Sequence, residues 1–248
     1  MRRYAADLHV HTALSPCADE AMSPPRVVLA AMDAGLDIIA ICDHNTAGNV
    51  AAAQEVAEGP GEGRVLVIPG IEITTAEEVH VVALFPDADT AMCASEVILA
   101  GFPCFDRDSR RYGRQLIMNG DGDIVGEEPR ILSAASQMPL AEAVAFVRGN
   151  GGLVIAAHVD RPSFSVGSQL GFFPPDVHFD AIEISTAGLA QGRDAEFRAL
   201  GLPVVTGSDS HSLELVGASR SYCYLETAAF HEIAAALRGA GGRSVGLA

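Results

Sequence analysis

The chain has 248 residues, of which 49% are hydrophobic, and its formal net charge is −16. This length suits one large α/β domain with a substantial core. No uninterrupted apolar run reaches the roughly 18 residues that a membrane-spanning helix needs. The negative charge argues against nucleic acid as the main partner, because binding nucleic acid relies on clustered Lys and Arg.

The cysteine pattern favours a reduced protein, because five cysteines are an odd number and form no C-x-x-C pair. We therefore expect a cytoplasmic location without structural disulfides. Arg2 and Arg3 are followed by no apolar stretch, so we expect no signal peptide.

Short apolar runs that end in His, Asp or Glu recur along the chain and predict strands of a parallel sheet covered on both faces. They lie at 5–11, 37–44, 64–72, 152–158, 179–185 and 203–209. Helical patterns separate them, at 23–35, 49–59, 139–151, 189–201 and 227–239. In the first helix, Ser23 is the expected N-cap and Gly35 the expected end. Alternating strands and helices indicate βα units, whose chemistry lies at the carboxyl ends of the strands.

Residues 87–135 interrupt this alternation of strands and helices. They are expected to form an insertion, either a lid over the barrel mouth or an oligomer contact. Within it, a hairpin is predicted to turn at 119–122. The same stretch superficially resembles a calcium loop. It lacks two required residues, because the glycine position holds Ile124 and the bidentate glutamate position holds Arg130.

The predicted strand ends collect imidazoles and carboxylates, which are ligands for zinc, manganese and iron. The set is His9, His11, Asp43, His44, Glu72, His80, His158, Asp209 and His211. The other two histidines, His178 and His231, are expected to be ordinary surface or core residues. Nine candidates are too many for one ion, so two or three divalent ions (Zn, Mn or Fe) are expected. Such ions would lower the pKa of a shared water, and the resulting hydroxide would attack phosphorus.

The segments DLHVHT, ICDHN, GIEIT with a following His, AAHVDR and TGSDSH resemble, in order, the motifs of the PHP (polymerase and histidinol phosphatase) superfamily. The resemblance extends from residue 5 to about residue 212. It implies one domain over residues 1–248, a distorted (β/α)7 barrel with a trinuclear metal site at the carboxyl ends of the strands, and phosphoesterase activity.

Carried over to this sequence, the resemblance assigns a role to each candidate. It implies that His9, His11, Glu72 and Asp209 hold the first metal, that Glu72 bridges to a second metal on His80 and His158, and that His44 and His211 hold a third. Glu72, Asp209 and His211 are the expected catalytic residues. Asp7 and Asp43 are expected to orient neighbouring ligands.

Two positions depart from the resemblance or need a special arrangement. Relatives supply a His or Asp shortly after the H-x-H motif, whereas here the candidates are Cys17, as a metal-binding thiolate or a small buried thiol, and Asp19. His80 begins an apolar run, so it reaches the site only if the segments IEITT (71–75) and VHVVALF (79–85) form a local hairpin or enter the site together as successive strands.

For the substrate, Arg161 is the first candidate, because a guanidinium three residues after His158 could bind a phosphate. The alternative is a surface salt bridge. Ser163, Ser165, Arg107, Arg110 and Arg111 are weaker candidates. A Ser/His/Asp triad within 208–211 is rejected, because such close neighbours lack the geometry and no G-x-S-x-G elbow is present.

The sequence therefore predicts a metal-dependent phosphoesterase acting on a small phosphorylated metabolite, and oligomerisation is possible. The alternatives are an amidohydrolase-like enzyme that cleaves C–N bonds and a non-catalytic metal-binding regulatory domain.

Overall fold

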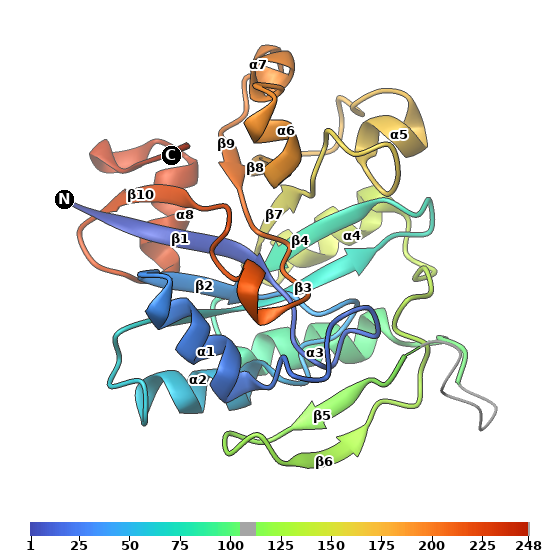
Figure 1. Ribbon diagram of the computed structural model, residues 1–248. Helices are drawn as coiled ribbons and strands as arrows, with labels where there is room; N and C mark the ends of the chain where they lie inside the picture. The colour runs from blue at the N-terminus through green and yellow to red at the C-terminus, as the bar shows by residue number, and fades with distance from the viewer. Residues whose placement is uncertain (105–112, 248) are drawn as a thin grey trace.

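The computed structural model describes residues 1–104 and 113–247, and the chain folds around one curled β-sheet (Figure 1). The strands of this sheet are β1 (Arg2–Val10), β2 (Ile38–Ile41), β3 (Leu66–Thr74), β4 (His80–Leu84), β7 (Leu153–Ala156), β8 (Ala181–Ile184), β9 (Val204–Thr206), β10 (Ser221–Leu225) and β11 (Ser244–Leu247). Their order is β11-β10-β1-β2-β3-β4-β7-β8-β9. The edge strands β9 and β11 contact each other, so the sheet is nearly closed. The predicted barrel-like α/β architecture is confirmed.

The sheet is mixed, although the apolar strand pattern predicted a parallel one. Parallel pairing joins β1 to β2, β2 to β3, β7 to β8 and β8 to β9. The β3–β4, β4–β7, β1–β10 and β10–β11 pairs are antiparallel. For β3 and β4 the reason is connection length: residues 75–79 make a turn that is too short for the crossover that a parallel pair requires.

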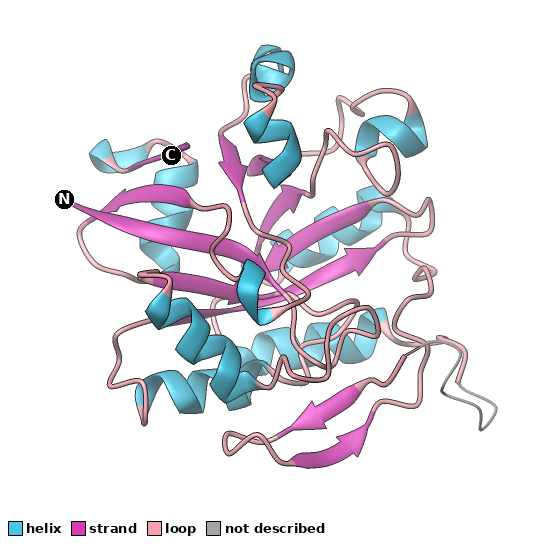
Figure 2. Cartoon of the chain, viewed as in Figure 1, coloured by secondary structure: helices cyan, strands magenta, loops and turns pink. Residues whose placement is uncertain are grey.

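Helices pack on both faces of the sheet (Figure 2). They are α1 (Pro24–Asp33), α2 (Val50–Glu58), α3 (Ala88–Ile98), α4 (Leu140–Gly149), α5 (Val166–Leu170), α6 (Thr186–Ala190), α7 (Asp194–Phe197) and α8 (Phe230–Leu237), with 3-10 turns η2 (Arg198–Leu200), η3 (Leu213–Leu215) and η4 (Ala240–Gly242). The continuous helix predicted over 189–201 is wrong. The left-handed backbone of Gly192 (φ 71°) divides it into α6 and α7. Among the described residues, none of the helices has the length and apolar character to cross a membrane.

Alternating side chains of the central strands enter two different apolar layers, which explains why these strands are mostly apolar. In β2, Ile38 and Ala40 pack in one cluster with Ile233 of α8, whereas Ile39 and Ile41 pack in another with residues of α1 and α2. Both faces of the strand are therefore buried. This rigid double-sided packing fixes the strand ends that carry the polar residues.

The segment after α3 contains the predicted hairpin, which is confirmed as β5 (Leu116–Met118) and β6 (Ile124–Glu127). Asn119 Oδ1 accepts hydrogen bonds from the backbone N–H groups of Asp121 and Asp123, which stabilises the turn. Asn49 joins the hairpin to the barrel, because its Nδ2 donates to Leu116 O and its Oδ1 accepts from Met118 N.

Candidate metal centre

The structure brings the predicted strand-end residues together at one end of the sheet. His9 is the second-last residue of β1 and His11 lies just beyond that strand. His44 follows β2, Glu72 lies in β3, His158 follows β7, and Asp209 and His211 follow β9. His80 joins them because β3 and β4 form an antiparallel hairpin in which it pairs with Thr74. This confirms the expectation that a local hairpin brings His80 to the site. His178 and His231 lie outside the groups that could hold an ion.

Glu72 lies at the centre of this cluster and is buried, with 1% of its surface exposed. Its Oε1 is 2.7 Å from His80 Nδ1, 3.1 Å from His158 Nε2 and 3.5 Å from His9 Nε2. Its Oε2 is 2.9 Å from His44 Nδ1. A carboxylate with imidazoles on both oxygens is suited to bridging two cations.

The first group contains His9, His11, Glu72 and Asp209, whose ligand atoms lie within 4.8 Å of one another. His11 Nε2 is 3.3 Å from His9 Nε2 and 3.0 Å from Asp209 Oδ1. The two imidazoles therefore share one side of the chain, as the alternation in the sequence predicts. Asp209 has a left-handed backbone (φ 48°), a conformation that is uncommon for a non-glycine residue and often found at functional sites.

Two further groups adjoin the first. One contains His44, Glu72 and His80, and the other contains His11, His44 and His211. His158 lies beside the former through its contact with Glu72. Because Glu72, His11 and His44 each belong to two groups, the three groups form one continuous cluster.

Unsatisfied polar atoms show that this cluster fits bound cations. Among the described residues, Glu72 Oε2, His44 Nδ1 and His158 Nδ1 are buried without a hydrogen-bond partner. Glu72 Oε2 and His44 Nδ1 are nevertheless only 2.9 Å apart. Buried polar atoms normally have partners, and imidazole nitrogen together with carboxylate oxygen is a donor set that binds zinc, manganese and iron.

The electrostatics of the ion-free cluster favour charged carboxylates. Burial acts to raise the pKa of Glu72, but the surrounding imidazoles of His80, His9 and His44 hold it well below its usual range. The pKa of Asp209 is likewise lowered, because His9 and His11 outweigh its burial. Burial lowers the pKa of His11 to about 3, so that its imidazole is neutral and can donate a lone pair.

Cys17 lies at the outer side of this cluster and is exposed. Its Sγ is 3.2 Å from His44 Nε2. Desolvation acts to raise the pKa of the thiol, but hydrogen bonds with His211 and His44 lower it to about 7. Because the thiolate is the form that binds a metal ion, this lowered pKa favours ligation. The side chain of Asp19 belongs to none of the three groups, which are drawn from the described residues.

Two acidic residues outside the groups hold the ligand-bearing segments. Asp43 accepts hydrogen bonds from Thr12 N and from Ser15 Oγ, both at 2.7 Å. Asp7 accepts from the backbone N–H groups of Ser208 and Gly217, each at 2.9 Å, and so fixes the segment that carries Asp209. Burial raises the pKa of Asp7 to about 6 in spite of these hydrogen bonds.

Two residues that contact the ligands were missed from the sequence. Glu183 in β8 is 3.0 Å from His9 Nδ1 through Oε2, and its Oε1 accepts from His158 N at 3.2 Å. Ser15 Oγ lies 2.9 Å from His11 Nδ1 and donates to Asp43. The signal for Glu183 was present, because it is the one acidic side chain inside an otherwise apolar strand segment, AIEI.

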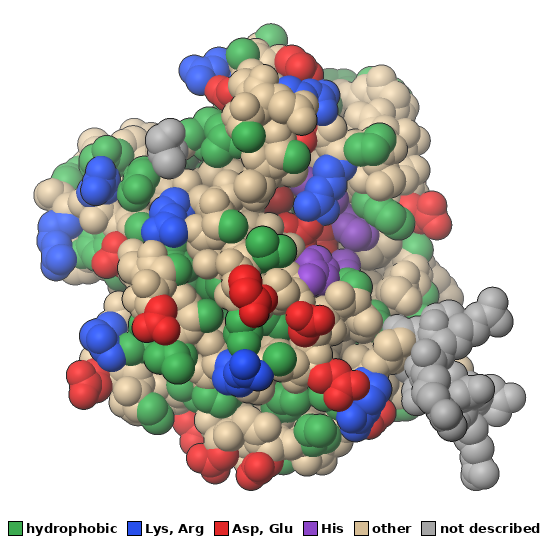
Figure 3. All heavy atoms as spheres, in the orientation of Figure 1, with side chains coloured by type: hydrophobic (Ala, Val, Ile, Leu, Met, Phe, Trp, Pro, Cys, Tyr) green, Lys and Arg blue, Asp and Glu red, His purple; other side chains and the backbone are tan. Residues whose placement is uncertain are grey.

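Arg161 lies at the rim of the cluster, where its Nη1 is 2.5 Å from Asp209 Oδ2. The guanidinium is 39% exposed. A hollow of about 400 Å³ adjoins it and is also lined by Thr186, Arg193 and Ser208. Figure 3 shows histidine side chains reaching the surface in a hollowed part of the same face, beside basic and acidic atoms.

Of the weaker substrate-binding candidates, the structure describes Ser163 and Ser165. Ser165 is occupied as the N-cap of α5, since its Oγ accepts from Ser168 N. Ser163 is exposed. Arg107, Arg110 and Arg111 lie outside the described residues.

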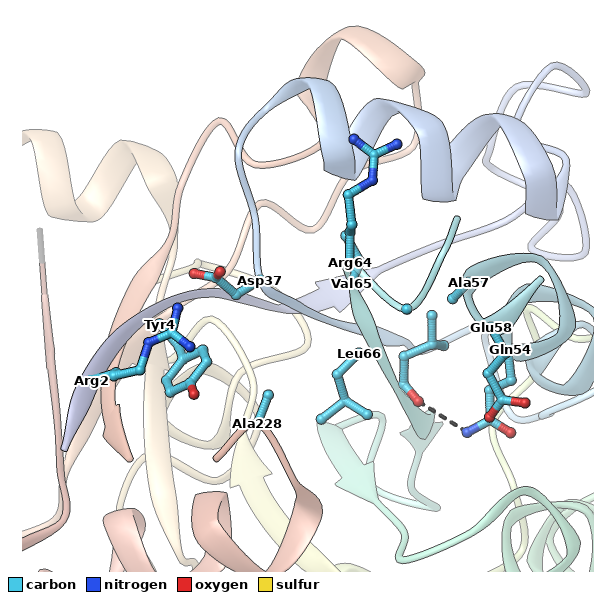
Figure 4. A pocket seen from close by; sticks show the side chains of 12 residues that line it. Arg2, Tyr4, Asp37, Gln54, Ala57, Glu58, Arg64, Val65, Leu66 and Ala228 are labelled. Carbon is cyan, nitrogen blue, oxygen red and sulfur yellow. Dashed lines mark hydrogen bonds between the residues drawn. The ribbon is translucent and has the colours of Figure 1, made fainter. Parts of the chain in front are cut away.

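A second hollow, of about 360 Å³, lies at the opposite end of the strands and is lined by Arg2, Tyr4, Asp37, Gln54 and Arg64 among others (Figure 4). Two of its polar side chains form hydrogen bonds to backbone groups of neighbouring strands. Asp37 Oδ2 accepts from Ala5 N, and Gln54 Nε2 donates to Val67 O. Its lining residues include neither His nor Cys, so the candidate metal centre remains at the carboxyl ends.

Known proteins with similar sequence or structure include nucleases. The chain is 32% identical over 158 residues to the 5'-3' exoribonuclease Rnm of Salmonella typhimurium strain LT2, a match covering 62% of this chain and 46% of that relative. The crystal structure of Endonuclease Q with a 27-mer duplex substrate containing an abasic lesion superposes with a TM-score of 0.70 at 17% identity, covering 98% of this chain and 58% of that one. The lesion-specific endonuclease PfuEndoQ from Pyrococcus furiosus gives a TM-score of 0.64 at 18% identity over the same shares of the two chains.

These similarities correct one expectation from the sequence. The net charge argued against nucleic acid as the main partner, yet a relative of this chain is an exoribonuclease and a protein of the same fold binds a DNA duplex. The argument was wrong because net charge is a sum over the whole surface. A substrate phosphate meets only the site, where bound cations would supply positive charge.

The PHP domain family matches residues 7–147, which is more than half of the chain and includes His9, His11, His44, Glu72 and His80. The chain spans about half the length of the Salmonella relative. The sequence motifs, the barrel-like fold and this match agree, and the chain belongs to the PHP domain family.

Proposed function

We propose that this chain is a metal-dependent phosphoester hydrolase that acts on the phosphodiester bonds of nucleic acid. The observation that carries the proposal is the position of Glu72, which belongs to two adjacent ligand groups and has imidazole nitrogens near both of its oxygens. Shared ligands place two or three ions close together, and adjacent ions suit the attacking and leaving oxygens of one phosphate.

The proposed ligand set starts from the three groups, gives each histidine to one ion, and adds His158 and Cys17, which lie beside the groups. His9, His11, Glu72 and Asp209 would hold one ion, and Glu72, His80 and His158 would hold another. His44, His211 and the Cys17 thiolate would hold a third. Bound ions would polarise a phosphoryl oxygen and lower the pKa of a water nucleophile.

The chain's own residues would position both the ions and the substrate. Glu183 accepts a hydrogen bond from the Nδ1–H of His9, which leaves Nε2 free for an ion. Arg161 is exposed at the rim and would bind a non-bridging phosphate oxygen while still paired with Asp209. His211 is part-exposed at the same rim, and its Nδ1 lies 2.8 Å from Asp209 O, which would leave Nε2 for the third ion.

Nucleic acid as the substrate is supported by the Rnm relative, named as a 5'-3' exoribonuclease, and by the Endonuclease Q complex. The test uses wild-type protein loaded with Mn²⁺ or Zn²⁺ and three sets of probes: 5'-phosphorylated single-stranded RNA, single-stranded DNA, and a panel of phosphomonoesters and amides. We expect release of nucleotides from at least one oligonucleotide. Amine release from the amides without cleavage of any phosphoester would overturn the proposal in favour of C–N hydrolysis.

Site variants connect the activity to this cluster. Asp209→Asn is expected to lower the hydrolysis rate by about 100-fold or more, because it removes an ion ligand and the partner of Arg161. His231→Gln is the control, since His231 is 79% exposed and outside the cluster. Undiminished hydrolysis by the Asp209 variant would mean that the activity arises elsewhere.

A further inference from the structure

Phe164 places an aromatic ring at the rim of the metal centre. Its side chain is 40% exposed. The ring stacks on the imidazole of His80, with ring centroids 4.6 Å apart and planes inclined by 23°. Phe164 O also accepts a hydrogen bond from His80 N at 2.8 Å. One part of the ring is therefore packed on a proposed ion ligand, while another part is open to solvent.

The backbone of Phe164 is strained, which packing alone does not explain. Its φ of 58° lies in the left-handed region, where a bulky side chain is a genuine outlier. The neighbouring residues hold it there: Ser165 Oγ donates to Arg161 O at 2.8 Å and also accepts from Ser168 N. Strain of this kind is concentrated at ligand-binding and catalytic positions.

The loop between β7 and α5 thus presents two different groups at the rim. Arg161 lies on the side of Asp209, through a contact of 2.5 Å. Phe164 lies on the side of His80. A nucleotide combines the two matching features, an anionic phosphate and a planar base, and exposed aromatic rings are the usual stacking platforms for single-stranded nucleic acid.

We infer that Phe164 is a base-stacking residue that determines specificity for nucleotides over other phosphoesters. This inference rests on the proposed function, because it places the phosphate of the substrate at the metal centre. The base next to that phosphate packs on the exposed ring of Phe164. Such stacking is independent of base identity, because every base has a π-face.

The test compares two probes that differ only by the base: adenosine 5'-monophosphate and ribose 5-phosphate. Binding to the Zn²⁺-loaded full chain is measured by calorimetry. Wild-type protein is expected to bind the nucleotide roughly 5- to 150-fold more tightly, the range typical of one stacked base. Phe164→Leu keeps an apolar group over His80 without a planar face, and is expected to abolish this preference. Phe164→Tyr is expected to retain it.

Each result has a defined meaning. Equal weakening of both probes by Phe164→Leu, with a fall in Zn²⁺ stoichiometry, would overturn the inference and make Phe164 a positioning residue for His80. Equal binding of the two probes by wild-type protein would also overturn it. The proposed function fails separately, if the loaded protein cleaves no oligonucleotide while still preferring the nucleotide in the binding measurement.

Discussion

Glu183 provides the sharpest test of how the fold prepares the metal centre. It is 2% exposed and contacts His9 Nδ1 through both carboxylate oxygens, at 3.0 and 3.2 Å. It also accepts from His158 N. The perturbation is Glu183→Gln, which keeps the shape and one acceptor oxygen but removes the negative charge.

The magnitude follows from these contacts. A carboxylate on the far nitrogen of a ligand imidazole raises the basicity of the ligating nitrogen, and losing it typically weakens metal binding by about 10- to 100-fold. That range corresponds to about 1.4–2.7 kcal/mol. Because Glu183 supports both His9 and the backbone of His158, we expect the upper half of the range for the ion on His9. The overall fold is expected to be unchanged.

The assay is competition with a chromophoric chelator for Zn²⁺, with circular dichroism to verify the fold. Glu232→Gln is the matched control, because Glu232 is also buried (4% exposed) but pairs with Arg243 beside α8. The control is expected to bind Zn²⁺ like the wild type. If Glu183→Gln binds Zn²⁺ within twofold of wild type, Glu183 does not tune the ligand and the reasoning is refuted.

Further predictions concern the cluster and the core. Glu72→Gln is expected to reduce the metal stoichiometry, measured by plasma mass spectrometry, by at least one ion per chain, and an unchanged stoichiometry would contradict its bridging role. Cys17→Ser is expected to abolish the thiolate-to-metal absorption band of the Co²⁺-loaded protein, whereas Cys93→Ser, at another exposed cysteine, keeps it. Burial acts to lower the pKa of His44, but the nearby Glu72 carboxylate outweighs this effect and raises the pKa to about 10. An incoming ion must therefore displace a proton from His44. Metal affinity should therefore increase by up to about tenfold per pH unit between about pH 6 and 8, and calorimetry in buffers of different ionisation enthalpy should detect proton release. Phe85→Ala, at a fully buried ring, is expected to lower the free energy of unfolding in urea by about 3–5 kcal/mol, and a loss below about 1 kcal/mol would contradict its place in the core.

The sequence by itself determined the strand ends and the chemistry that they carry. Apolar runs such as 37–44 can be recognised in the sequence because both faces of the strand are buried. A polar residue at the end of such a run is then easy to identify. His9, His11 and His44 could be identified in this way without any knowledge of which strands are neighbours. The hairpin at 119–122 was equally local, since the hydrogen bonds of its turn join residues between 119 and 123.

Only the tertiary structure decided which side chains share an ion and which support them. Glu72 contacts histidines from β1, β4 and the segments after β2 and β7, and such pairings depend on strand order and direction. Glu183 contacts His9 from a strand 174 residues away in the sequence. Phe164 lies over His80 only because a strained loop brings it there. Local periodicity carries no information about such distant contacts, because they are set by how the barrel closes.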